Sequence, residues 1–132
     1  MTVIRATEQT LTAANKPEWC HIPRAGFFQL GKEGGEHDCH YHDYNELYLI
    51  CRGKAKIMNA GQGHYVKQGD IVCIEAGAEH DILELYGDEG LQLFWLYEPG
   101  PPGGRFGHLH RSDEKACRHP VPVKPTPADF PS

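Results

Sequence analysis

Apolar residues in this chain form short runs that are separated by glycine-rich breaks. The runs are rich in Ile, Val, Leu, Tyr and Phe, and such runs between glycines predict β-strands. No window of about 12 residues shows the apolar period of an amphipathic helix. One helical turn is expected at Ser112–Cys117, with Ser112 as its N-cap. Strands are predicted over Gly26–Leu30, Glu46–Arg52, Ala55–Met58, His64–Val66, Asp70–Ile74, His80–Leu85 and Leu91–Tyr97.

Many short strands joined by tight turns predict a β-sandwich or a β-barrel. A closed or nearly closed barrel is favoured, because closure leaves no exposed strand edges. With 132 residues, the chain has room for one hydrophobic core. We therefore expect an all-β protein with a single core.

Composition divides the chain into three parts. Residues 1–18 are mostly polar and contain Pro17, so we interpret them as an N-terminal arm. Residues 19–98 hold nearly all the bulky apolar side chains and should form the barrel. Eight of the ten prolines fall in residues 99–132. Because proline is excluded from helix and sheet interiors, this part should be an extended C-terminal arm on the domain or on a partner.

Charge and cysteine content limit the partners and the compartment. The net charge of −5 argues against a nucleic-acid partner, which requires a basic surface. The chain has neither a long apolar run nor a basic amphipathic stretch, so no membrane partner is expected. The first residues carry no apolar stretch typical of a signal peptide. The five cysteines show no C-x-x-C spacing and are interpreted as free thiols in the cytoplasm.

Four residues have the spacing and chemistry of metal ligands. His40 and His42 are separated by one residue, so on extended backbone their side chains share a face. Glu46 follows after a polar stretch, and His80 begins another predicted strand. Three imidazoles and one carboxylate suit a divalent first-row metal such as iron, manganese, nickel, cobalt, copper or zinc. We predict His40, His42, Glu46 and His80 as metal ligands.

The same residues carry a resemblance to the cupin superfamily, whose first motif is G-x5-H-x-H-x3,4-E-x6-G. The chain matches every element of it: Gly34, five residues, His40-Tyr41-His42, three residues, Glu46, six residues and Gly53. The second motif is G-x5-P-x-G-x2-H-x3-N. Here Gly69, Gly77 and His80 match, whereas Glu75 replaces the proline and Glu84 replaces the asparagine. The short stretch Lys54–Gln68 between the motifs is similar to that of small single-domain bacterial cupins.

The resemblance implies a double-stranded β-helix, or jelly-roll barrel, with one divalent transition metal inside (iron, manganese, nickel or zinc). It places His40, His42, Glu46 and His80 around that metal and leaves other metal positions open. Because small cupins are commonly dimers whose arms cross, it also implies a homodimer. Cupins serve many functions, so the resemblance does not indicate which reaction the protein catalyses.

Several other residues are candidates for the pocket. Glu84 shares strand parity with His80, so we expect it to point inward, either for proton transfer or substrate contact or in an ion pair. Tyr48 has the parity of Glu46, and Tyr44 lies beside the ligands, so both are catalytic candidates. Phe28 and Trp95 could also form walls, but core packing is favoured for all four aromatic residues. Arg24 and Arg105 could pair with a substrate carboxylate, but solvated surface positions are favoured. His37 is expected at the rim. His108 and His110 repeat the H-x-H spacing; they could cap the barrel mouth or bind a second metal, but an exposed arm is favoured.

Two classes of function fit this pattern. The favoured one is a metal-dependent enzyme acting on a small polar organic molecule, either as a dioxygenase or as a Lewis-acid isomerase, lyase or decarboxylase. The alternative is a non-catalytic cupin that binds or senses a small ligand. The complete ligand set and the lack of a helix-turn-helix segment favour the enzyme.

Overall fold

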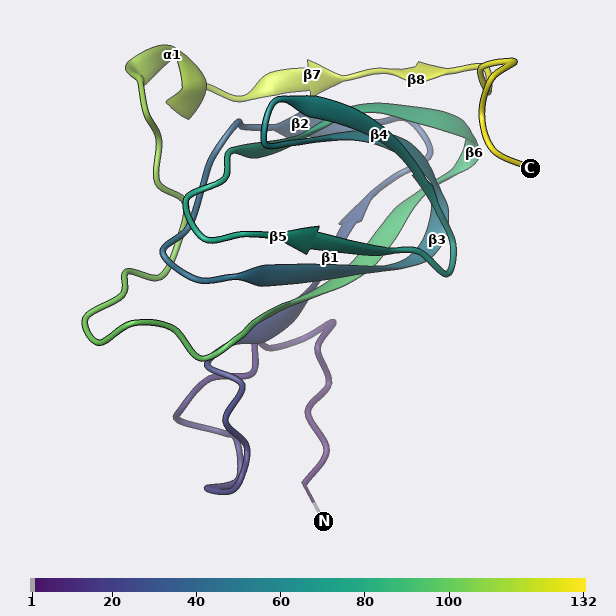
Figure 1. Cartoon of the computed structure of the whole chain (residues 1–132). Helices are drawn as coiled ribbons and strands as arrows, with labels where there is room; N and C mark the ends of the chain where they lie inside the picture. Colours follow the sequence, from purple (N-terminus) through teal and green to yellow (C-terminus); the bar gives the residue numbers. More distant parts are fainter. Residues whose placement is uncertain (1) are drawn as a thin grey trace.

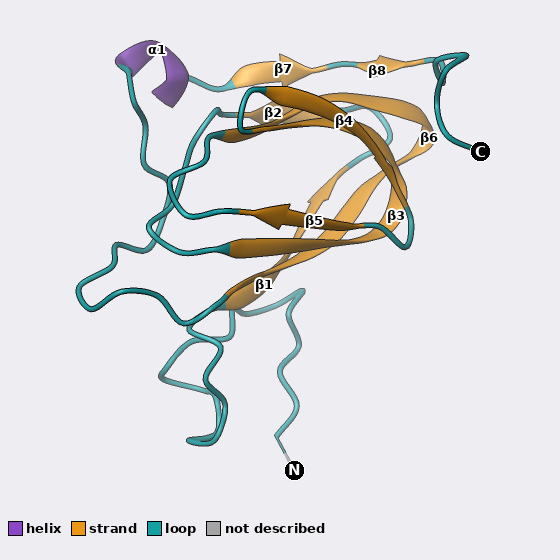
Figure 2. Cartoon of the chain, in the orientation of Figure 1, coloured by secondary structure: helices purple, strands orange, loops and turns teal. Residues whose placement is uncertain are grey.

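Two long strands form the frame of the molecule in the computed structural model, which describes residues 2–132 (Figure 1). These strands are β3 (Glu46–Asn59) and β6 (His80–Tyr97), and they pair antiparallel along most of their length. The main sheet has the order β1-β6-β3-β4, where β1 is Ala25–Leu30 and β4 is Gln62–Lys67. β5 (Ile71–Ile74) also pairs with β3. Strands dominate the molecule, as Figure 2 shows, and the expected all-β jelly-roll fold is confirmed.

Each long strand unites two of the predicted strands by bending at its middle. Gly53 of β3 faces Leu91, but the next residue, Lys54, faces Tyr86, so residues 87–90 of β6 loop out at this point. Gly53 has a φ of 92°, and a Cβ there would lie 1.9 Å from the carbonyl oxygen of Gly90. Only glycine fits both conditions. The bend folds the sheet over itself, and the sheet curls without closing, with β1 and β4 at the ends of its order.

The bends give the barrel two different ends. Glu46 begins β3 and pairs with Tyr97 at the end of β6, while Asn59 at the end of β3 pairs with His80. All four strand termini therefore meet at one end, which we call the open end. The bends at Gly53 lie at the other, which we call the closed end (Figure 1).

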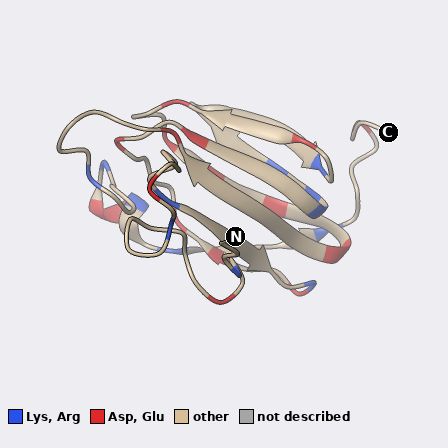
Figure 3. Cartoon of the chain, turned by 90° about the horizontal axis from the view of Figure 1, so that it is seen from below, with Lys and Arg blue, Asp and Glu red and all other residues tan. Residues whose placement is uncertain are grey.

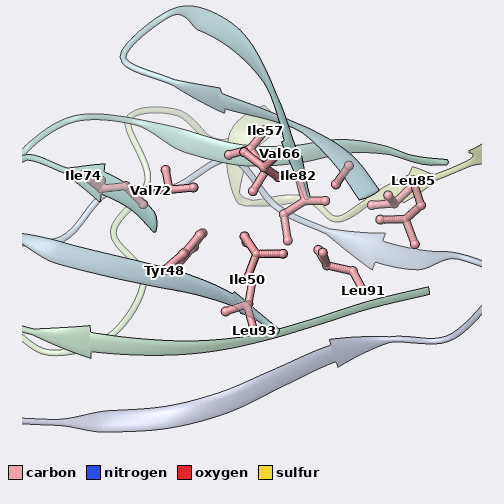
Figure 4. Close-up of a cluster of buried hydrophobic side chains, with 12 residues drawn as sticks. Tyr48, Ile50, Ile57, Val66, Val72, Ile74, Ile82, Leu85, Leu91 and Leu93 are labelled. Carbon is pink, nitrogen blue, oxygen red and sulfur yellow. The ribbon is translucent and has the colours of Figure 1, made fainter. Parts of the chain in front are cut away.

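The core lies between the two layers (Figure 4). Its side chains alternate with outward ones along β3, as the burial of Tyr48, Ile50, Ala55 and Ile57 shows. These are the inward positions of a pleated strand. The buried cluster comprises Tyr48, Ile50, Ala55, Ile57, Val66, Val72, Ile74, Ile82, Leu85, Leu91, Leu93 and Val121.

The C-terminal arm lies on its own domain. The predicted helical turn is present as α1 (Asp113–Ala116), and the Ser112 side chain accepts a hydrogen bond from the Lys115 amide. β7 (His119–Val121) then pairs with β2 (Gly35–His37), and β8 (Val123–Lys124) pairs parallel with β6. Near its end, Phe130 packs against Tyr65 and Tyr86. The domain boundaries at residues 18/19 and 98/99 stay a prediction.

Charged residues of both signs are interspersed over the strands and loops visible in Figure 3. In residues 2–132, no helix is long and apolar enough to cross a membrane. All five cysteines are free thiols, as expected.

Candidate metal centre

The four predicted ligands meet at the open end of the barrel. Ring nitrogens of His40, His42 and His80 lie within 4.8 Å of one another. The Glu46 carboxylate oxygen Oε1 lies 3.4 Å from Nε2 of His42 and 3.2 Å from Nε2 of His80. The four residues are at most 3% exposed. Backbone hydrogen bonds in both directions between His40 and His80 hold the two ligand segments together.

Backbone carbonyls fix the orientation of all three imidazoles. Nδ1 of His40 donates to the Asp38 carbonyl, Nδ1 of His80 to the Ala78 carbonyl, and Nδ1 of His42 to the Gly107 carbonyl. These distances are 3.0, 3.0 and 2.8 Å respectively. Because a carbonyl only accepts, each Nδ1 carries the proton and each neutral ring presents the lone pair of Nε2. This is the arrangement in which a protein orients histidine toward a metal.

Two buried polar atoms in the described residues have no hydrogen-bond partner, and a metal ion would satisfy both of them. Glu46 Oε1 and His80 Nε2 have no hydrogen-bond partner within residues 2–132. With His80 in the tautomer above, they are two acceptors 3.2 Å apart. Buried polar atoms without a partner are costly, and a cation between these atoms would satisfy both. Three nitrogens and one carboxylate oxygen suit a divalent transition metal.

The charge states of two ligands agree with this fit. Burial opposes ionisation of Glu46, but its contacts with His42 and His80 outweigh burial and lower the pKa of the carboxyl group. Burial, with nearby His80 and His108, lowers the pKa of His40 to about 2.

His42 behaves differently from His40. Burial also acts to lower the pKa of His42, but the contact with Glu46 outweighs it and raises that pKa. Protons therefore compete with a metal for His42, since a metal needs the neutral ring.

A cavity of about 390 Å³ opens beside the ligands. Its walls include Phe28, Tyr48, Trp95 and Arg24. The other lining residues are Thr10, Thr12, Glu36, His37, Asp38, Leu93, Tyr97, Gly107, His108 and Arg118. Aromatic walls around a few polar groups are typical of sites for small organic molecules.

The family model described as "Cupin domain" matches residues 26–97, which include the whole ligand set. The chain belongs to the cupin family. This confirms the resemblance carried by the two sequence motifs.

A known bacterial protein is similar to part of this chain. The chain is 35% identical over 72 residues to the uncharacterized protein y4oW of Sinorhizobium fredii (strain NBRC 101917 / NGR234). That match covers 54% of this chain but 32% of the relative, so the chain spans about a third of its length.

Two solved structures share the fold. A cupin 2 conserved barrel domain protein from Rhodopseudomonas palustris has a TM-score of 0.58 at 16% identity, with 76% of this chain and 64% of that chain covered. Oxalate decarboxylase from Bacillus subtilis, described with Mn(II) centres, has a TM-score of 0.56 at 20% identity. The match covers 69% of this chain and 24% of that enzyme.

The two tyrosine candidates of this cupin have different positions. Tyr48 lines the cavity, and its ring centroid lies 6.0 Å from that of His80. Burial raises the pKa of Tyr48 well above its ordinary value, so its hydroxyl keeps its proton. Tyr44 instead packs with its ring nearly parallel to those of Tyr97 and Phe106, and its hydroxyl donates to the Gly104 carbonyl at 3.2 Å. Tyr44 therefore holds the loop at the barrel mouth and does not line the cavity.

Glu84 does not point inward, so the expectation from strand parity was wrong. Ile82 pairs with Ile57, but Glu84 pairs with Lys56, so Leu83 is an extra residue in β6. This β-bulge inverts the alternation between His80 and Glu84. Glu84 accepts hydrogen bonds from the Lys124 ammonium group at 2.9 Å and the Tyr86 hydroxyl at 2.8 Å, and these contacts lower its pKa.

Two histidines of the arm lie beside the centre. His108 is exposed, as the favoured expectation of an exposed arm had it, whereas His110 is partly buried. The His108 ring stacks on His40 with centroids 3.6 Å apart and an angle of 6°. His110 Nε2 hydrogen-bonds the buried Asp38 carboxylate. His108 and His110 thus cap the barrel mouth. The repeated H-x-H spacing was the sequence signal, but the chain path that brings it here was not visible in the sequence.

His37 is more buried than the expected rim position, whereas Arg105 lies at the surface, as favoured. His37 is 7% exposed and lines the cavity, with Nδ1 2.7 Å from Oδ1 of buried Asp81. His119 contacts the same carboxylate from β7. Arg105 is exposed and forms an ion pair with Asp43 at 2.8 Å, so it lies outside the cavity. Glu75 is exposed.

Proposed function

We propose that this cupin is a metal-dependent enzyme acting on a small polar organic molecule. The observation that carries the proposal is the pair of unpartnered buried acceptors, Glu46 Oε1 and His80 Nε2, beside a cavity. His40, His42, Glu46 and His80 would hold one divalent metal (iron, manganese, nickel or zinc). The Mn(II) centres named for oxalate decarboxylase make manganese a natural first metal to test.

A bound metal supplies Lewis acidity at this site and, when it is redox-active, dioxygen chemistry. The chain's own residues bind and orient the substrate. Tyr48, Phe28 and Trp95 line the cavity. The protonated Tyr48 hydroxyl would donate a hydrogen bond to a bound substrate, and the two apolar rings would exclude water from the walls. The site suits two reaction classes, namely a dioxygenase and an isomerase, lyase or decarboxylase that stabilises an enolate.

Metal analysis tests the site. Wild type should bind one metal ion per chain, whereas His40→Ala and His80→Ala should retain less than about a tenth of it at the same metal concentration, since each loses a ligand. His64→Ala is the matched control, because His64 is exposed on β4. Unchanged metal content in both ligand variants would overturn the site.

Turnover assays separate the reaction classes. Oxygen consumption by the iron(II) protein with diketones, thiols and hydroxy acids identifies a dioxygenase. Conversion without oxygen consumption identifies Lewis-acid chemistry, and Tyr48→Phe should slow either reaction. Ligand binding without turnover of any compound would support the non-catalytic sensor instead.

We also propose that two copies form a homodimer through the outer face of the sheet. Two neighbouring rows of outward side chains are apolar on β5, β3, β6 and β1. They comprise Ile71, Leu49, Phe94 and Phe27, then Cys73, Leu47, Leu96 and Ala25. Ile71 is 60% exposed and Phe94 is 42% exposed. A continuous exposed apolar patch is typical of an interface.

The mass in solution tests this dimer. Phe94→Glu should convert a dimer to a monomer in light scattering, whereas Val3→Glu, at another exposed apolar residue, should not. A wild-type monomer would contradict the dimer.

We also propose that the protein is cytoplasmic, because its five thiols are free.

A further inference from the structure

The metal ligands share their cavity with a braced arginine. Arg24 lies just before β1 and lines the cavity. Its guanidinium carbon is 4.3 Å from the centre of the Phe106 ring. Phe106 is in turn parallel to Tyr44 and Tyr97, with interplanar angles of 4° and 6°. Stacking fixes the plane of a guanidinium group and leaves its N–H edges available.

Arg24 has no anionic partner within residues 2–132. It forms neither an ion pair nor a side-chain hydrogen bond with any described residue, although it is half-buried. In contrast, Arg105 pairs with Asp43, Arg111 with Glu79 and Arg52 with Glu89. A half-buried cation that faces a cavity without a partner is available for a ligand.

A second guanidinium group lies at the same cavity. Arg118 follows α1, is exposed, lines the cavity and likewise forms no ion pair within the described part of the chain. Three carboxylates, those of Glu36, Asp38 and Glu46, also line the cavity. Asp38 is already engaged by His110, with His108 Nδ1 at 3.5 Å, and Glu36 is exposed. Glu46 belongs to the proposed metal ligands, so a bound metal would offset its charge. Of the charged groups that remain without an ion pair in the described residues, Arg24 is half-buried, whereas Arg118 and Glu36 are exposed to solvent.

We infer that the substrate carries a carboxylate that Arg24 binds through two parallel N–H···O hydrogen bonds, with Arg118 as a second contact. The planar fork of guanidinium matches a carboxylate, and such charge-assisted pairs are strong. The class is a small carboxylic acid, with its other polar group toward the metal ligands. The inference rests on the proposed function, because it names the substrate class of that same cavity. Of the two arginines that the sequence suggested, the structure assigns this role to Arg24.

Fluorescence of Trp95 provides a direct binding test. Trp95 lines the cavity, whereas the other tryptophan, Trp19, is 78% exposed. In a Trp19→Phe background, the emission therefore reports on the cavity alone. The probe is malonate, titrated into the zinc-loaded and the metal-free protein, with neutral malonamide as the comparison ligand.

Arg24→Met should weaken malonate binding by about 10–100-fold, which is the usual loss for a hydrogen-bonded charge pair. Arg24→Lys, which keeps the charge but loses the fork, should lie between that variant and wild type. Arg118→Met should weaken binding by less than Arg24→Met, because Arg118 is exposed. The control is Arg52→Met, at an exposed arginine whose side chain lies near Glu89 at the closed end. Malonamide should bind far more weakly than malonate.

Three results would overturn the inference. These are no malonate binding by wild type, equal binding of malonamide, or Arg24→Met binding as tightly as Arg52→Met. Zinc content, measured on each variant, separates this failure from failure of the metal site. If Arg24→Met retains zinc and still binds malonate normally, the carboxylate site is wrong and the metal centre stands. If wild type binds no zinc but Arg24→Met loses malonate affinity, the proposed metal function fails and the carboxylate site stands.

Discussion

The closed and open ends of the barrel are built from the same two strands but have opposite interiors. At the closed end, Ala55, Leu85 and Leu91 are at most 1% exposed and bury only apolar atoms. At the open end, His80 is equally buried, yet its Nε2 and the Glu46 Oε1 have no partner in residues 2–132. Burial of apolar groups stabilises a fold, whereas burial of unpaired polar atoms opposes it. The closed end therefore maintains the fold, and the open end is shaped for a ligand.

The largest effect should come from the closed end. Leu91→Ala should lower the free energy of unfolding by about 2–5 kcal/mol, because it removes a fully buried side chain and leaves a cavity. Thermal or denaturant unfolding measures this loss. Metal content per folded chain should stay at the wild-type level, with Val3→Ala as the exposed control. Loss of metal from folded Leu91→Ala would show that the two ends are not independent.

Metal binding at the open end should raise the free energy of unfolding by an amount similar to the loss in Leu91→Ala. A metal ion at about 100 times its Kd should raise the free energy of unfolding by about 2.7 kcal/mol, because it binds the folded chain. Paired melts with and without zinc measure this difference. In His80→Ala the difference should vanish, since a ligand is lost. A persistent shift in that variant would indicate binding elsewhere.

A smaller effect is expected one contact away from the ligands. Tyr97 places its hydroxyl 3.2 Å from Nδ1 of His42. Tyr97→Phe should weaken metal affinity by about tenfold, because partners that orient a ligand contribute to its affinity. Competition with a chelator measures the change. Tyr65→Phe is the matched control on β4, and equal affinities in both variants would assign the orientation of His42 to the Gly107 carbonyl alone.

The smallest effect is expected at Glu84. Glu84→Gln should lower the free energy of unfolding by about 0–1 kcal/mol at neutral pH, since a partly exposed ion pair contributes little. The pKa of Glu84 is lowered by Lys124 and Tyr86, so this contribution is present above the ordinary glutamate pKa of 4.5. It disappears as the pH falls through the lower folded-state value. The unfolding curves of wild type and Glu84→Gln should therefore differ slightly at neutral pH and coincide at acidic pH. A loss of turnover in Glu84→Gln would instead support a catalytic role for Glu84.

Local spacing accounts for the parts of the molecule that could be predicted. Short apolar runs between glycines predicted the strand segments, and the spacing of His40, His42, Glu46 and His80 predicted the candidate ligands. The sequence did not show that two pairs of predicted strands are continuous, because glycine at Gly53 marks a bend as readily as a turn. The bulge at Leu83 was also hidden, since one extra residue leaves no clear mark in composition.

The sequence by itself determined the fold family and the four candidate ligands. These depend on side-chain type and on short spacings that the extended backbone converts directly into shared faces. Only the tertiary structure decided which outer residues join the site. It placed Arg24 in the cavity and Arg105 on Asp43, turned Glu84 outward, and stacked His108 on His40. The physical reason is that these contacts depend on bulges, bends and the path of the C-terminal arm, which bring together residues far apart in the chain.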